Sequence, residues 1–247
     1  MLKPRLTRVV EEVFAIGGNH DTAKDIELRE KLLDFLREED HVILPGDDPN
    51  LVLAKDMIRF IDADKIYADT SDGKLAHPHV KLFLERLMES DLDKWHYYEL
   101  KLLISTVNFT ENIEQAIELA SKADRRILQF KRVRLTEKLE GYLALNMCSR
   151  ILSAKYFDSA NIDLVNSEFK FWFRKLEKLT EEYPQENQLA LIFLITKIRE
   201  ALFKGHSTDA HQLCEELESY HDEKIARMVN NEVHCYTTSK EYTGFGN

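Results

Sequence analysis

Asn146 and Arg150 are the residues whose types and spacing offer the clearest chemistry in this sequence. They are four residues apart within 143–162, where apolar residues recur at helical spacing, so both side chains should stand on one side of a helix. An amide donates and accepts hydrogen bonds, and a guanidinium adds a charge that pairs with a carboxylate. The pair predicts the helical turn that contacts the ligand in an all-helical receptor. The alternative is two solvated polar side chains on a helix surface.

Other groups capable of chemistry lack the spacing of a known kind of site. His77 and His79, or His206 and His211, could bind a metal, but neither pair has helical i, i+4 spacing with a third ligand. The sequence contains no GxSxG motif, phosphate loop or dinucleotide-binding glycine run. We therefore predict no metal, no cofactor and no enzyme activity. The enzyme alternative is a helical hydrolase that uses histidine and carboxylate groups.

Charge and composition narrow the class of protein. The formal charge of −10 opposes nucleic-acid binding by this chain alone, because neutralising phosphates requires a clustered basic face. The sequence lacks an apolar run long enough to span a membrane and a signal peptide, which predicts a soluble, cytoplasmic protein. Three cysteines without CxxC spacing predict reduced thiols, as expected in the cytoplasm.

Apolar periodicity predicts helices along the whole chain. Eight Gly and five Pro in 247 residues are few, which favours long helices over a many-stranded fold. A turn cluster at 70–73 and Pro78 predict a hinge, so we expect N-terminal helices in 1–78, a repeat region in 79–240 and a frayed tail in 241–247. The predicted helices are 5–16, 22–39, 49–61, 79–88, 94–107, 111–123, 132–155, 160–183, 186–204, 208–220 and 222–238.

Three turn aromatics indicate a repeat. Phe109, Phe157 and Phe203 each close a predicted helix, and they recur 48 and then 46 residues apart. A hydroxyl residue after each aromatic is placed to cap the next helix: Thr110, Ser159, and Ser207 or Thr208. A period near 47 residues made of helix pairs predicts an all-α fold, a right-handed TPR-like solenoid of antiparallel helix pairs.

The repeat register selects residues for the inner surface of this solenoid. Counting back eleven and seven positions from each turn aromatic gives Tyr98, Leu102, Asn146, Arg150, Ile192 and Thr196. Such a groove, with apolar walls and few polar groups, suits a short hydrophobic peptide. The aromatic run FKFWF contains Trp172 and Phe173; most of it should be core, and a ring left outside is a candidate dimer contact.

Two segments carry a resemblance to a known family. The segment KWHYYELKLL at 94–103, followed by YLALN and by the YFD run that ends at Asp158, resembles the C-terminal regulatory domain of the Rgg/GadR/MutR family of Gram-positive transcription regulators. In that family a W-x-Y-Y-E-[IL]-x-L-L motif opens a repeat, and an Asn lies about ten residues before a Tyr-Phe turn. The corresponding residues here begin at Trp95 and continue to Asn146 and the Tyr156-Phe157 pair.

The resemblance implies a homodimeric helical-repeat domain that binds a short signalling peptide on its concave face, as in quorum sensing. Asn146 would then hold the peptide main chain, and Arg150 would meet a carbonyl or the peptide's C-terminus. Thr196 and Asn230 follow from the inferred register. Family members begin with a helix-turn-helix domain, and nothing before Glu89 matches one, so DNA would be contacted only through a domain not present in this chain, or not at all. The alternative function is a TPR-like adaptor that binds a partner protein.

Overall fold

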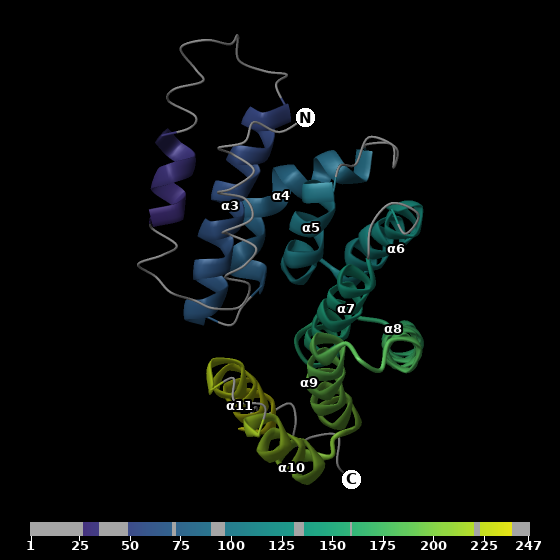
Figure 1. Cartoon of the computed structure of the whole chain (residues 1–247). Coiled ribbons are helices and arrows are strands. Elements are labelled where there is room, and N and C mark those ends of the chain that lie inside the picture. The colour runs from purple at the N-terminus through teal and green to yellow at the C-terminus, as the bar shows by residue number, and fades with distance from the viewer. Residues whose placement is uncertain are drawn as a thin grey trace. The chain divides into compact units, whose positions relative to one another are not determined.

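The computed structural model describes residues 27–34, 49–70, 73–89, 97–130, 136–158, 160–219 and 223–238, and these residues are helical apart from short turns. The all-α prediction is therefore confirmed over this part of the chain. The chain divides into two compact units, 1–111 and 112–247 (Figure 1). The helix predicted at 5–16 and the tail at 241–247 lie outside the described residues.

The first unit is built on a pair of long helices. Helix α3 (Pro49–Thr70) packs along α4 (Gly73–Glu89), and the short α5 (Tyr97–Thr106) and η2 (Val107–Phe109) pack against α3 and α4 respectively. The helical residues 27–34 are tied to α3 by an ion pair in which Arg29 Nε lies 2.9 Å from Asp62 Oδ1. The boundary predicted between residues 78 and 79 falls inside α4, in this unit. Pro78 is in the second turn of α4, where its missing N–H removes only one helical hydrogen bond.

A charged cluster joins three elements of the first unit. Asp56 of α3 is only 3% exposed, and its carboxylate accepts hydrogen bonds from Arg86 of α4 at 2.5 Å and from Arg59 at 3.1 Å. Arg86 also donates to Glu99 of α5 at 2.7 Å. Burial raises the pKa of the Asp56 carboxyl, and both guanidiniums oppose this rise. The cluster is structural, because each charge in it is compensated by a neighbour.

The second unit is a series of helices in which each packs on the next. These are α6 (Ile113–Phe130), α7 (Glu137–Phe157), α8 (Ile162–Glu182), α9 (Asn187–Lys204), α10 (Ser207–Glu218) and α11 (Glu223–Thr238). In addition α7 packs against α9, and α9 packs against α11. Helix α7 is buried around most of its circumference, so the expectation of a single apolar stripe on it was too narrow. Its mid-helix Gly141 allows this close packing, because an added Cβ would lie 2.6 Å from Leu189 Cδ2 of α9.

Helices α7 and α9 lie parallel. Side chains near the start of α7 contact the start of α9, and side chains at the end of α7 contact the end of α9. The hydrogen-bonded residues are 46 or 48 positions apart: Gln188 Nε2 donates to Tyr142 Oη, Lys155 Nζ donates to the Phe203 carbonyl, and Tyr156 Oη donates to the Leu202 carbonyl at 2.9 Å. These separations match the period near 47 residues found in the sequence.

Asparagines, not the predicted hydroxyl residues, cap two helices of this unit. Asn161 Oδ1 accepts hydrogen bonds from the backbone N–H groups of Asp163 and Leu164, at 2.9 and 3.2 Å, at the start of α8. Asn112 Oδ1 accepts from the Gln115 N–H at 2.8 Å in the same way before α6. The predicted cap Thr110 lies two residues before Asn112, and its hydroxyl donates to the Val107 carbonyl at 3.0 Å. Ser159 lies outside the described residues, and α10 begins at Ser207 without a side-chain cap.

The turn aromatics differ in burial. Phe109 and Phe203 are 2% and 8% exposed, as a repeat junction requires, whereas Phe157 is 49% exposed. Its neighbour Tyr156 is 7% exposed and fills the corresponding place at the end of α7. Phe157 thus ends α7, as predicted, but its ring does not pack in the core as those of Phe109 and Phe203 do. Tyr156 is suited to this place because its hydroxyl can reach a carbonyl at the end of α9.

Candidate functional site

Helix α7 exposes one stripe of side chains to solvent. Apart from Lys155, the residues of this helix that solvent reaches follow one another at helical spacing: Lys138, Tyr142, Asn146, Ser153 and Phe157. Asn146 is half-buried in the middle of this stripe. The structure therefore places Asn146 where a ligand could reach it, on a helix that is otherwise packed on all sides.

Arg150 lies one turn beyond Asn146 but is buried. The residue is only 4% exposed, and its Nη1 atom lies 2.9 Å from Oδ2 of Asp158, the residue that ends α7. An unpaired guanidinium at such a depth would be costly, and Asp158 compensates it. This placement makes Arg150 a residue that positions the end of α7, which differs from the open carboxylate-binding role expected from the resemblance.

Sequence reasoning missed a second buried arginine, Arg199 of α9, which is 7% exposed. Its Nε and Nη2 atoms donate to the two carboxylate oxygens of Glu232 of α11 at 2.9 and 3.0 Å, and its Nη1 atom donates to the Leu145 carbonyl of α7 at 3.2 Å. One guanidinium thus joins three helices. Arg199 lies about one period after Arg150, a signal that the register counted from the turn aromatics did not use.

The ends of α7 and α11 meet in an aromatic cluster. The ring of Tyr236 lies 5.5 Å from the Tyr156 ring and 5.6 Å from the Phe157 ring, measured between centroids. Beside it, the Lys155 ammonium lies 4.2 Å from the centroid of Phe203, and burial lowers the pKa of this lysine. We call the surface of α7 and α9 formed by Asn146, Tyr156, Phe157 and Arg199 the inner face; Glu232 and Tyr236 of α11 pack against it.

The remaining predicted peptide-binding residues have different surroundings. Thr196 is fully buried, and its hydroxyl donates to the Ile192 carbonyl of its own helix at 2.8 Å. Asn230 is half-buried and donates to Glu218 Oε1 at 3.1 Å. Tyr98, half-buried, and Leu102, fully buried, belong to the first unit. Within the second unit, Asn146 is thus the predicted residue best placed to meet a ligand.

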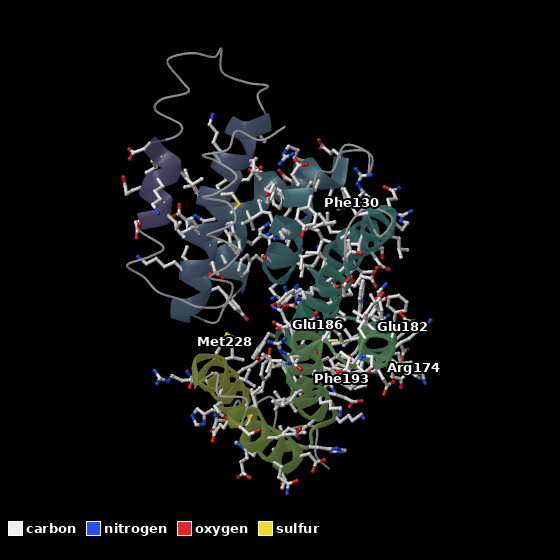
Figure 2. All side chains as sticks on the ribbon, viewed as in Figure 1. Phe130, Arg174, Glu182, Glu186, Phe193 and Met228 are labelled. Carbon is white, nitrogen blue, oxygen red and sulfur yellow. The ribbon has the colours of Figure 1, made fainter. Side chains whose placement is uncertain are left out.

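The predicted dimer contact separates into a core residue and a surface residue. Trp172 is 1% exposed, so its ring packs inside the second unit. Phe173 is half-buried, and its ring centroid lies 6.3 Å from that of Phe169 and 5.7 Å from that of Phe193. Figure 2 labels Phe193, which belongs to α9. The only strongly exposed ring of the FKFWF run is Phe171, at 53%.

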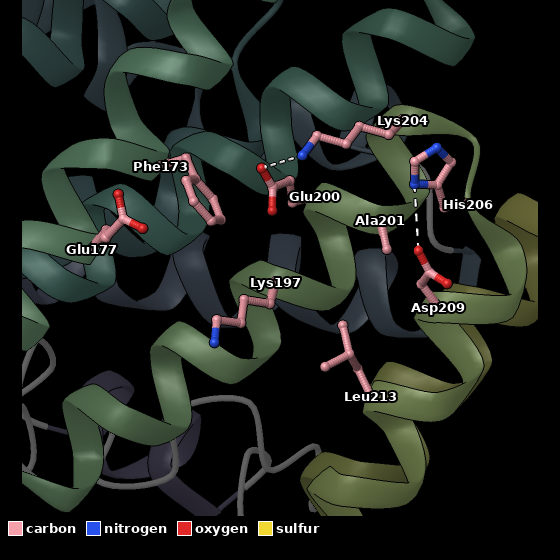
Figure 3. A pocket seen from close by; sticks show the side chains of 9 residues that line it. All are labelled: Phe173, Glu177, Lys197, Glu200, Ala201, Lys204, His206, Asp209 and Leu213. Atoms are coloured by element: carbon pink, nitrogen blue, oxygen red, sulfur yellow. Dashed lines mark hydrogen bonds and ion pairs between the residues drawn. The ribbon is translucent and has the colours of Figure 1, made fainter.

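Phe173 also lines a surface pocket of about 360 Å³ between α8, α9 and α10 (Figure 3). Two ion pairs occupy its rim: Lys204 Nζ lies 2.7 Å from Glu200 Oε1, and His206 Nδ1 lies 3.4 Å from Asp209 Oδ2. None of the predicted peptide-binding residues lines it. Its charges of both signs offer no recognisable catalytic arrangement.

The groups considered for metal binding and nucleophilic chemistry have structural surroundings. His77 Nδ1 donates to the Phe109 carbonyl at 2.7 Å. Across the described parts of the chain, no three His, Cys, Asp or Glu side chains come together in a way that could hold a metal ion. Burial raises the pKa of the Cys148 thiol to about 12, which disfavours a reactive thiolate. None of the helices described here has the length and apolar character needed to cross a membrane.

Comparison with known protein families, with curated proteins and with solved structures finds no match for this chain.

Proposed function

We propose that residues 112–247 form a peptide-binding regulatory domain whose ligand binds on the inner face. The observation that carries this proposal is the solvent-reached stripe of α7, which presents Asn146 from the most buried helix of the unit. An amide in such a place can donate to and accept from the main chain of a bound peptide. A site on a rigid, packed helix also holds that amide in one position.

The expected fold, a TPR-like solenoid, supports the same proposal. Parallel packing of α7 on α9, with contacts 46 and 48 residues apart, is what successive first helices of a TPR-like solenoid would make. Helices α8 and α10 would then be the second helices of each pair. A right-handed solenoid of this kind curves, and its concave side would carry the inner face.

The resemblance to the Rgg/GadR/MutR regulators extends the proposal to a role in the control of transcription. A short signalling peptide would bind in the cytoplasm to a homodimer of this chain, and binding would alter transcription through a helix-turn-helix domain of the kind that this family has. Asn146 carries the proposed peptide contact, and Arg150 keeps the end of α7 in place.

A second candidate function is an adaptor that binds a helix of a partner protein. The observation that favours it is that the inner face already holds a helix, α11, through Glu232 and Tyr236. The two candidates differ in the ligand: a sensor needs only a peptide of about ten residues, whereas an adaptor needs a longer helical segment.

A selection experiment tests the proposal. A phage-displayed library of peptides of about ten residues is selected on the purified chain, and synthetic copies of the selected peptides are titrated by fluorescence anisotropy. Asn146→Ala should weaken binding by on the order of 1–3 kcal/mol, or about 5-fold to about 150-fold in Kd. Asn166→Ala is the matched control, because Asn166 is an exposed asparagine on α8. The proposal is wrong if no peptide is selected or if both variants bind like the parent. Binding restricted to longer helical segments would favour the adaptor.

A further inference from the structure

Helix α11 places a carboxylate and an aromatic ring on the inner face, one helical turn apart. Glu232 and Tyr236 are four residues apart, so they lie on the same side of α11. The Glu232 carboxylate accepts both hydrogen bonds of the Arg199 fork, and the Tyr236 ring packs on Tyr156 and Phe157. The chain itself thus supplies, through α11, a carboxylate and an aromatic ring that bind to the inner face as the groups of a ligand would.

Helix α11 packs on α9 over fewer residues than α10 or α7 does. The buried residues of α10 are Ala210, Cys214 and Leu217, and the apolar residues that α11 buries are Ala226, Val229, Val233 and Tyr236. Large side chains such as Trp172, Phe169 and Leu176 fill the core beneath α8 instead. Helices with few buried contacts open at a lower free energy than the core of a protein. Helix α11 is therefore the element that can leave the inner face most readily.

The residues that α11 covers are suited to bind a carboxylate and an aromatic ring, the two groups that α11 supplies. The Arg199 side chain is 8% exposed, and loss of Glu232 would remove both carboxylate hydrogen bonds from this buried charge. Its planar fork matches the two oxygens of a carboxylate. Phe157 remains 49% exposed even with Tyr236 beside it, so its ring has exposed surface against which an aromatic ring of a ligand can pack.

We infer that the inner face is a receptor for a helical segment that carries a carboxylate and an aromatic ring one turn apart, and that α11 occupies this receptor in cis. A ligand or partner segment with the same pattern would compete with α11 for Arg199 and for the Tyr156 and Phe157 rings. This inference rests on the proposed function, because it assigns the ligand chemistry and the regulation of the same face.

The probe for the test is a fluorescein-labelled synthetic peptide with the sequence of residues 223–238, titrated into the full chain. The Glu232→Gln variant weakens the hold of α11 on Arg199, so it should bind this peptide about tenfold more tightly than the parent chain does. Glu215→Gln is the matched control, since Glu215 is exposed on α10 and should leave peptide affinity at the parent value. Peptides in which the positions of Glu232 or Tyr236 carry Gln or Ala should bind at least about tenfold more weakly.

Hydrogen exchange supplies a second readout that does not depend on the folding of one variant. Binding of the peptide should accelerate amide exchange in α11 and leave α7 and α9 protected. If Glu232→Gln does not fold, Tyr236→Leu weakens the same contact and takes its place. Slower exchange in α11 on peptide binding, equal affinity of the altered peptides, or no binding to any variant would each overturn the inference.

The outcome also separates this inference from the proposed function. If selected peptides of about ten residues bind at Asn146 without competition from the α11 peptide, the receptor inference fails and the proposed function stands. If the α11 peptide binds as expected and no short peptide is ever selected, the signalling-peptide proposal fails and the competition between α11 and a helical partner stands.

Discussion

Replacing the two neighbouring aromatics at the end of α7 gives the sharpest test of how the second unit is assembled. Tyr156 is 7% exposed and Phe157 is 49% exposed, so the two rings differ in burial although they are adjacent. Tyr156→Ala should lower the free energy of unfolding by about 3–5 kcal/mol, the cost of deleting a buried aromatic ring. Phe157→Ala should cost only about 1 kcal/mol, because half of its surface already meets water.

Tyr156→Phe isolates the contribution of the hydroxyl. The Leu202 carbonyl that accepts the hydroxyl hydrogen bond also accepts one from the Gly205 N–H at 3.0 Å, so it keeps a partner in the variant. The expected cost is therefore at the low end of the range of about 0.5–1.5 kcal/mol for a hydrogen bond. This makes Tyr156→Phe a control that preserves the ring while removing the contact between the two helices.

The assay is urea unfolding followed by the fluorescence of Trp172. The chain has two tryptophans, and Trp172 lies in the second unit, so all variants are made in a Trp95→Phe background that leaves Trp172 as the only reporter. Unfolding of the first unit then does not contribute to the signal. Equal losses for Tyr156→Ala and Phe157→Ala, or a larger loss for Phe157→Ala, would refute the assignment of Tyr156 as the junction residue.

Three further outcomes follow from single features of the structure. Gly141→Val should destabilise the second unit by about 1–3 kcal/mol in the same urea assay, because its side chain would overlap Leu189; an unchanged midpoint would mean that α7 and α9 are further apart. The pKa of Asp56 in the folded state is above its ordinary value of 3.8, so ionisation of this carboxyl disfavours the folded state. The stability of the parent relative to Asp56→Asn should therefore fall as the pH rises from about 3 to about 6. A rise would contradict burial as the cause of the raised pKa. Cys235 is exposed and should react with a thiol reagent at about pH 8 before Cys148, which burial protects until the chain unfolds.

The helix boundaries were readable from the sequence because local signals mark them. Gly205 ends α9 in a left-handed conformation with φ of 79°, and the N–H of His206 reaches back to the Ala201 carbonyl at 2.8 Å, as expected of a glycine helix terminator. The predicted ends of α5, α8, α9, α10 and α11 are close to the observed ones, whereas α3 and α6 continue to residues 70 and 130, beyond the ends predicted at 61 and 123. The prediction of a helix start after Pro78 failed because α4 begins earlier and includes the proline.

The candidate site was only partly readable, because burial of a polar side chain depends on helices that are distant in sequence. Asn146 and Arg150 share one side of α7, as their spacing indicated, but Asp158 and the neighbouring helices bury Arg150 and leave Asn146 at the surface. Thr196 resembled a groove residue by register, yet its hydroxyl bonds within its own helix. The contact between Arg199 and Glu232 joins residues 33 positions apart, and no local pattern encodes it.

Side chains of α7 donate hydrogen bonds to carbonyls at the end of α9, which affects the sequence changes that this helix end can tolerate. Lys155 and Tyr156 donate to the Phe203 and Leu202 carbonyls, which a helix usually leaves to water or to the residues that follow it. Because these two carbonyls are hydrogen-bonded from α7, the end of α9 keeps part of its hydrogen bonding whichever residues follow Gly205. Substitutions in the turn just after Gly205 are therefore changes that the end of α9 should tolerate.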